Sequence, residues 1–138
     1  MKEGCVFCDI LQGKKYQPMI YEDKTTAAFL DMRPATVKGG HTLVIPKKHY
    51  ELITDIPDLE IQALALTVKK VSKALLRFGK GVNILQNNKR VAGQYVMHAH
   101  FHVIPRFEND GIRMEFGFQK VYKEGLMEDI SAKIRKLL

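Results

Sequence analysis

The sequence predicts an α+β fold with an antiparallel sheet. Short strand-like runs joined by tight turns flank a single long segment with helical periodicity. The chain of 138 residues is long enough for one sizeable core, and it contains no internal repeat, low-complexity tract or linker. We therefore expect a single domain that covers residues 1–138.

The first half of the chain is expected to supply one short helix and three strands, over residues 7–12, 19–22, 26–30 and 42–45. Gly13 closes the short helix. Asp23 and Lys24 form a tight turn between the first two strands, and Gly39-Gly40 separates the second strand from the third. Strands that follow one another through short turns favour antiparallel pairing.

The clearest helix is predicted over residues 57–78. Its apolar residues recur at steps of three and four, at Ile61, Leu64, Val68, Val71 and Leu75. Acidic residues occupy its first turn and basic residues its last, as the helix dipole favours. We expect this helix to cover one face of the sheet.

The second half continues with a strand over residues 82–86, a loop over 87–94 and a strand over 96–104. Residues 106–125 are ambiguous. A terminal helix over 126–138 is expected to turn its apolar residues inward, namely Ile130, Ile134 and Leu137.

Composition limits the classes of partner. The net charge is +7 and the sequence pI is about 9.4, which favours anionic ligands. The basic residues form no dense patch with interleaved aromatics, so a nucleic-acid partner is not expected. The N-terminus is polar and no apolar stretch approaches the length of a membrane span, so we expect neither a secretory signal nor a membrane span. We expect a cytoplasmic protein.

The most informative stretch is His98-Ala99-His100-Phe101-His102, which places three of the five histidines two residues apart. In an extended strand this spacing puts all three imidazoles on one face and the intervening apolar residues on the other. A metal, a phosphate or nucleophilic catalysis would explain such a face, and so would simple exposure to solvent.

Metal binding is the first possibility. Cys5 and Cys8, spaced as a half-site, could form an S2N2 zinc site with His49 and one histidine of the triplet. Spacing alone does not assign the histidines. Two or three triplet histidines could instead share a catalytic zinc, or the cysteines could be reduced and buried. A thioredoxin-like redox pair is disfavoured, because only four residues precede Cys5.

Nucleophilic catalysis is the second possibility. Neutral imidazole is a good nucleophile near pH 7, and its attack on phosphorus splits one displacement into two easier steps. The loop over residues 87–94 just precedes the triplet and carries amides, two cations and a glycine. This composition suits a phosphate, although an ordinary polar turn has the same composition.

The ordered motifs resemble the histidine triad (HIT) family. They are Cys5-Val6-Phe7-Cys8, Ala28-Phe29-Leu30-Asp31, Gly40-His41-Thr42-Leu43-Val44-Ile45-Pro46-Lys47-Lys48-His49, Ala92-Gly93-Gln94 and His98-Ala99-His100-Phe101-His102-Val103-Ile104. They span residues 5–106. Residues 107–138 carry no such motif and are expected to form a C-terminal extension.

The resemblance implies a five-stranded antiparallel sheet, one long helix and a short zinc-bearing N-terminal segment, in a homodimer whose sheets join. It implies hydrolysis or transfer at the α-phosphate of a purine nucleotide, which we expect to be adenine-based. The substrate would be a nucleoside phosphoramidate or a dinucleoside polyphosphate. By position, His100 is the nucleophile and His102 contacts the α-phosphate.

Further roles follow from the same resemblance. Asp31 would hold the ribose hydroxyls, His41 would lie near the reacting strand, and Asn87 and Gln94 would face the phosphate. One structural zinc per chain would be held by four ligands, Cys5, Cys8, His49 and His98.

Two residues depart from the family pattern. Tyr95 stands where many relatives have Ser or Thr, and Lys89 where Gly is frequent. Because of these two departures, the sequence does not indicate whether the leaving group is an amine or a nucleotide. The alternative to an enzyme is a zinc-stabilised purine-nucleotide-binding interaction module with negligible turnover.

Overall fold

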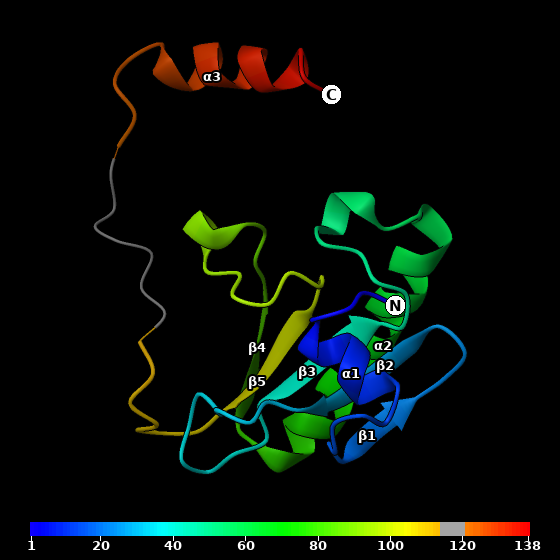
Figure 1. Cartoon of the computed structure of the whole chain (residues 1–138). Coiled ribbons are helices and arrows are strands. Elements are labelled where there is room, and N and C mark those ends of the chain that lie inside the picture. The colour runs from blue at the N-terminus through cyan, green and yellow to red at the C-terminus, as the bar shows by residue number, and fades with distance from the viewer. Residues whose placement is uncertain (114–120) are drawn as a thin grey trace.

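The computed structural model describes residues 1–113 and 121–138, which form an α+β fold around a five-stranded antiparallel sheet (Figure 1). The strands are β1 Met19–Glu22, β2 Thr26–Leu30, β3 Thr42–Pro46, β4 Gly81–Gln86 and β5 Phe101–Arg106. Their order across the sheet is β1-β2-β3-β5-β4, with every neighbouring pair antiparallel. The predicted fold class is confirmed.

Helices cover both faces of this sheet. Helix α1, Val6–Leu11, lies on one face, and the long helix α2, Asp58–Phe78, lies on the other (Figure 1). Two short 3-10 turns, Ile53–Asp55 and Arg90–Ala92, interrupt the connecting segments. Of the helices that the structure describes, none is long and apolar enough to cross a membrane.

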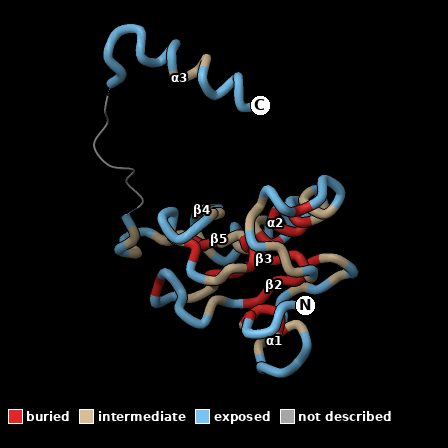
Figure 2. Tube along the Cα trace, turned by 45° about the horizontal axis from the view of Figure 1, so that its top comes forward, coloured by how far each residue is buried: buried red, intermediate tan, exposed pale blue. Residues whose placement is uncertain are grey.

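The alternation of side chains along the strands builds two separate cores. In β3, Leu43 and Ile45 pack with Phe7 on the α1 side, whereas Val44 packs with Leu64 on the α2 side. Figure 2 shows these buried segments of β2 and β3 lying between the helices. Both faces of β3 are therefore buried. The core on the α2 side supports the sheet, and the α1 side has room for a cavity.

The histidine strand is shorter than predicted. We expected a strand over residues 96–104, but β5 begins at Phe101, where pairing with Val44 of β3 and Gln86 of β4 begins. Upstream of β5, the N–H of Ala99 bonds instead to the carbonyl of Tyr50, at 2.6 Å. Side-chain alternation predicts an extended segment, but sheet pairing depends on where the neighbouring strands end.

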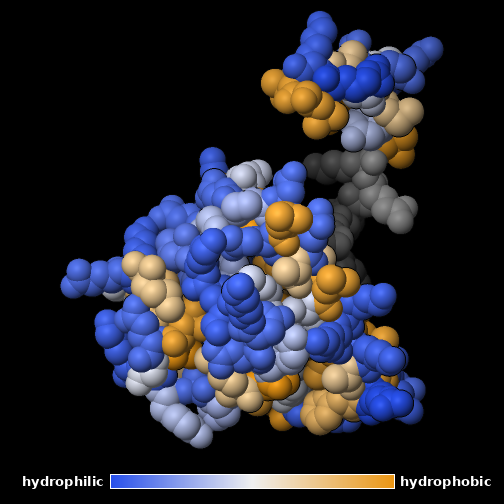
Figure 3. Space-filling model, turned by 90° about the vertical axis from the view of Figure 1, so that its right-hand side faces the viewer, coloured by the Kyte–Doolittle hydropathy of each residue, from blue (hydrophilic) through white to orange (hydrophobic). Residues whose placement is uncertain are grey.

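The terminal helix also differs from expectation. Helix α3 forms over Leu126–Arg135, but none of its residues is buried, and Ile134 is 54% exposed. The predicted inward placement of Ile130, Ile134 and Leu137 is therefore wrong. Helix α3 lies away from the sheet and α2 (Figure 1), so no core formed by residues 1–113 covers its apolar side chains, some of which are visible on its surface in Figure 3.

Arg106 holds the segment after β5 against the sheet. Its Nε and Nη2 donate to the two carboxylate oxygens of Asp110, at 2.7 and 3.0 Å. Nη2 also donates to the carbonyl of Ile112 at 2.7 Å, and Nη1 donates to the side-chain oxygen of Asn83 in β4. We call this set the Arg106 clasp. It ties residues 107–112 to the edge of the sheet.

Candidate active site and metal centre

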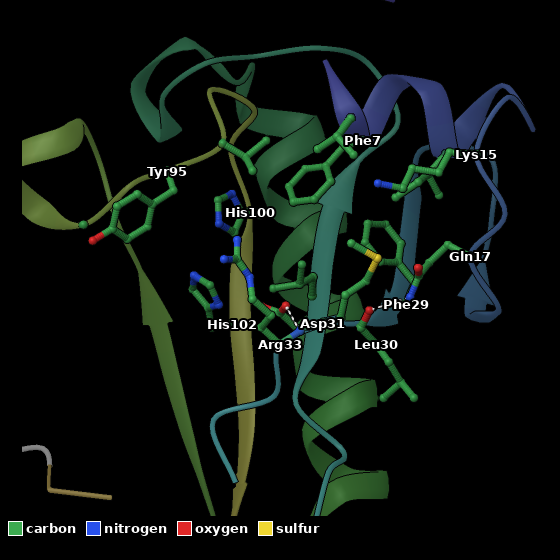
Figure 4. Close-up of a pocket in the computed structure, with 16 residues that line it drawn as sticks. Phe7, Lys15, Gln17, Phe29, Leu30, Asp31, Arg33, Tyr95, His100 and His102 are labelled. Carbon is green, nitrogen blue, oxygen red and sulfur yellow. Dashed lines mark hydrogen bonds between the residues drawn. The ribbon is translucent and has the colours of Figure 1, made fainter. Parts of the chain in front are cut away.

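A cavity of about 560 Å³ opens on the α1 face of the sheet (Figure 4). One end is apolar and includes Phe29 and Leu30 of β2 (Figure 4). The other end contains His100 and His102, with Phe7 of α1 beside His100 and Asp31 between the two ends (Figure 4). A nucleotide has the same division between a flat apolar base and a charged phosphate.

Hydrogen bonding fixes the tautomer of His100. Its Nδ1 lies 2.7 Å from the carbonyl oxygen of His98, and because a carbonyl only accepts, Nδ1 must carry the proton. Nε2 of the neutral ring therefore has a free lone pair. Burial lowers the pKa of His100, which keeps the ring neutral. His100 is therefore a buried neutral imidazole that lines the cavity and has an unprotonated nitrogen.

A second hydrogen-bond chain fixes His102. The N–H of Ala35 donates to Nδ1 of His41 at 3.2 Å, so the His41 proton is on Nε2. That Nε2 lies 2.9 Å from Nδ1 of His102 and donates to it. The His102 proton must then be on Nε2. Burial, with contributions from the neighbouring His100 and His41, lowers the pKa of His102 to about 4.

Asp31 anchors the turn beside this chain. Its Oδ1 accepts the N–H of Arg33 at 2.9 Å, and its Oδ2 lies 3.8 Å from Nε2 of His41. Burial lowers the pKa of His41 although Asp31 acts in the opposite direction. Asp31 lines the cavity between the apolar and histidine residues of its wall, a position suited to hydroxyl groups.

The loop before the triplet is braced by its own side chains. Gln94 is fully buried; its Oε1 accepts the N–H of Lys89 and its Nε2 donates to the carbonyl of Glu51, both at 2.7 Å. Nδ2 of Asn87 donates to the carbonyl of Gly93 at 3.3 Å. Neither Asn87 nor Gln94 lines the cavity, where we expected both to face the phosphate. In this geometry they position the loop.

Four predicted metal ligands converge behind the triplet: Cys5, Cys8, His49 and His98, whose donor atoms all lie within 4.8 Å of one another. Sγ of Cys5 is 3.6 Å from Nδ1 of His98, and Sγ of Cys8 is 3.5 Å from Nδ1 of His49. Zinc bound at about 2.3 Å by sulfur and about 2.0 Å by nitrogen would place tetrahedral donors roughly 3.5 Å apart. The donor set therefore fits zinc.

The hydrogen bonding of His98 supports the same conclusion. Its Nε2 donates to the carbonyl of Pro46 at 2.9 Å, which leaves Nδ1 unprotonated and directed at the cysteines. Burial lowers the pKa of His98 to about 4, so the ring is neutral, as a ligand must be. The donor groups found among the described residues never combine two triplet histidines, which disfavours a catalytic zinc shared within the triplet.

A second group of possible ligands is Asp31, His41 and His102. Its two histidines are 2.9 Å apart and joined by a hydrogen bond. That bond uses the His102 nitrogen that a metal would need, so proton donation explains the group better than metal binding.

Sequence reasoning did not identify Arg33 as a site residue. Arg33 lines the cavity, and its backbone N–H donates to Asp31. A single arginine in a turn carries no spacing pattern. Tyr95 also lines the cavity and is 77% exposed. Phe7 packs edge-on against both His98 and His100, with ring centroids 5.8 and 5.3 Å away. Phe7 therefore contacts the predicted metal ligand His98 on one side and lines the cavity beside His100 on the other.

Together, the antiparallel sheet and the alternating histidines define a histidine-triad type of protein. The HIT domain model matches residues 12–109. The chain belongs to the HIT family.

Individual relatives agree with this assignment. The chain is 48% identical over 114 residues to a HIT-like protein of Methanocaldococcus jannaschii, covering 82% of this chain and 87% of the relative. It is 37% identical to an adenosine 5′-monophosphoramidase of Schizosaccharomyces pombe, covering 96% and 99%. The crystal structure of a HIT family member from Bacillus subtilis superposes with a TM-score of 0.87 at 37% identity, covering 99% and 98%.

Proposed function

We propose that this protein is a nucleotide hydrolase or transferase that acts at the α-phosphate through a nucleotidyl-histidine intermediate on His100. The observation that carries the proposal is the tautomer of His100, whose free Nε2 belongs to a ring lining the cavity. Membership of the HIT family and the activity named for the S. pombe relative support the same class of reaction.

In the first step, the Nε2 lone pair of His100 forms a bond to the α-phosphorus, and the bond from phosphorus to the leaving group breaks. The bonding electrons remain on the leaving oxygen, or on a leaving nitrogen that takes a proton from solvent as it departs. In the second step, a water oxygen attacks phosphorus, the P–N bond breaks and its electrons return to Nε2. The products are a nucleoside monophosphate and the free leaving group. The proton released by water goes to solvent, where it replaces the proton taken up when the leaving group is an amine.

The neighbouring residues take complementary roles. Nε2–H of His102 donates to a non-bridging oxygen of the α-phosphate, where negative charge concentrates in the transition state. Asp31 holds the ribose hydroxyls, and the apolar end with Phe29 and Leu30 takes a purine base. We propose adenine as the base, in a phosphoramidate or a dinucleoside polyphosphate, and we place the reaction in the cytoplasm.

One structural zinc per chain is proposed at Cys5, Cys8, His49 and His98, whose donor geometry fits it. When bound, zinc would tie the N-terminal segment to the residues that lead into β5. His100 remains outside this donor group. The metal therefore has no part in the proposed steps.

A homodimer is proposed through sheet continuation and packing of α2. Leu66 and Leu76 of α2 are 65% and 57% exposed, and Ile84 on the edge strand β4 is 53% exposed. Burial of these side chains against a second copy would remove apolar surface from water. Light scattering at micromolar concentration is expected to give the mass of two chains, and the mass of one chain would contradict the proposal.

The nucleotidyl-histidine intermediate can be detected directly. After rapid quenching with a diadenosine polyphosphate or adenosine 5′-phosphoramidate, mass spectrometry should find an adenylyl group on the peptide containing His100. The same experiment on His100→Ala should find none. Nucleotide binding without any labelled peptide would favour the alternative, a nucleotide-binding module with negligible turnover.

A further inference from the structure

We propose that Arg33 selects the leaving group and favours an anionic one, such as a phosphate chain, over an amine. This inference rests on the proposed function, because it assigns the leaving-group side of the same cavity. The carrying observation is a guanidinium at the histidine end of the cavity, on a turn that is fixed to the histidine chain (Figure 4).

The backbone position of Arg33 is fixed from two sides. Its own N–H donates to Oδ1 of Asp31 at 2.9 Å, and two residues later the N–H of Ala35 donates to Nδ1 of His41 at 3.2 Å. His41 in turn donates to His102 at 2.9 Å. Arg33 therefore sits in the middle of a short turn whose two ends bond to the Asp31–His41–His102 group. Its side chain starts beside the phosphate end.

The charge at this end of the cavity is otherwise unfavourable for an anion. Asp31 lines the cavity beside the histidines, with Oδ2 3.8 Å from Nε2 of His41, and adds a carboxylate. Lys15, the other cationic residue that lines the cavity, lies on the far side with Gln17 (Figure 4). Arg33 is the cationic side chain at the histidine end.

Among the residues that the structure describes, no carboxylate competes for the guanidinium. The ion pairs of residues 1–113 and 121–138 do not include Arg33, which is an exposed residue. A positively charged group that lines a cavity without an ion-pair partner can bind an incoming anion without first breaking a salt bridge. Its planar donors match two phosphate oxygens at once.

The charge that develops on the leaving group explains why Arg33 would favour a phosphate over an amine. When the P–O bond to a phosphate leaving group breaks, the electron pair remains on oxygen and negative charge grows there, which a nearby guanidinium stabilises. When the P–N bond to an amine breaks, the departing nitrogen needs a proton. Arginine cannot supply one, because its guanidinium stays protonated in proteins. Arg33 therefore assists the first class of leaving group and not the second.

The test compares two substrates that share the adenosine and the α-phosphate, diadenosine tetraphosphate and adenosine 5′-phosphoramidate. Arg33→Gln should lower kcat/KM for the tetraphosphate about 10- to 100-fold, the effect of losing one charge-assisted bond, and leave the phosphoramidate within about 3-fold. Arg33→Lys should recover part of the loss because the charge returns. Lys38→Gln removes a cation from the same connecting segment, outside the cavity lining, and should leave the ratio of the two substrates unchanged.

The outcomes separate this inference from the proposed function. Equal losses on both substrates would place Arg33 on the shared α-phosphate and overturn the leaving-group assignment. Unchanged kinetics in Arg33→Gln would also overturn it. In either case the proposed function stands if the wild-type protein still adenylylates His100. Absence of turnover and of labelling in the wild type would refute the proposed function itself.

Discussion

His41 and His102 share a hydrogen bond of 2.9 Å between Nε2 of the first ring and Nδ1 of the second. Because Nδ1 of His41 already accepts the N–H of Ala35, the bond has a single direction, from His41 to His102. A backbone amide in the turn after β2 therefore determines which nitrogen of His102 carries a proton. The turn and the histidine segment are thus linked in one proton-ordering chain.

Breaking this chain should impair catalysis without removing the nucleophile. His41→Phe keeps a ring of similar size but loses both nitrogens, so His102 can place its proton on either nitrogen. We expect kcat to fall about 2- to 5-fold, because a donor aimed at developing charge is present only part of the time. Steady-state kinetics measure the loss, and heteronuclear NMR of the imidazole nitrogens reports the His102 tautomer. An unchanged tautomer together with reduced kcat would contradict this explanation.

The three triplet histidines should fail in three different ways. His100→Ala should lower kcat by several orders of magnitude and retain nucleotide affinity, since covalent catalysis is lost but Asp31 and the apolar end remain. His102→Ala should slow the reaction and keep the labelled intermediate. His98→Ala should instead lose zinc and stability. Measuring kcat, bound zinc and nucleotide affinity on all three tests the assignment, and near-normal kcat in His100→Ala would refute it.

Metal content can be tested without activity. Elemental analysis of protein purified without added metal should find one zinc per chain, and a chelator should lower the melting temperature, because metal binding is coupled to folding. Cys5→Ser should lower both zinc content and stability far more than Lys14→Ser, a surface change close in sequence. Absence of metal with two titratable thiols in the folded protein would contradict the zinc site.

Lys89 should make the folded protein less stable than a glycine at the same position would. Its backbone angles, φ 69° and ψ 159°, lie in a region that is essentially restricted to glycine and costs a residue with a side chain about 1–3 kcal/mol. Lys89→Gly should therefore raise the free energy of unfolding by about 1 kcal/mol after the greater freedom of glycine in the unfolded chain is subtracted. Urea denaturation measures the change. Arg90→Gly, whose φ is negative, is the control and should destabilise; a loss of stability in Lys89→Gly would contradict the strain.

Much of the fold could be predicted because it depends on local pattern. The apolar stripe of α2 and the short runs of β1 to β4 are properties of neighbouring residues, and these elements form close to where the sequence places them. The start of β5 and the packing of α3 depend on distant partners. Periodicity identifies an extended segment or an apolar face, but it does not identify what pairs with it or covers it.

The same distinction applies to the site. The spacing of Cys5 and Cys8 indicates half of a metal site. His49 is distant in sequence, and only folding brings it close to the two cysteines. The alternation of the triplet correctly suggested that its imidazoles share a side, and the structure adds that His98 and His100 have different neighbours. Arg33 has no sequence signal at all. Its position follows from the turn that Asp31 and His41 hold in place.

The Arg106 clasp fixes the point at which the chain leaves the sheet after β5. The clasp satisfies its polar groups from Asn83, Asp110 and Ile112, so no residue of α3 is needed to complete it. The proposed nucleophile and the proposed metal ligands all precede Arg106 in the chain. The clasp therefore holds the chain in place up to Ile112 independently of α3, and we expect substitutions on the exposed surface of α3 to leave the clasp intact.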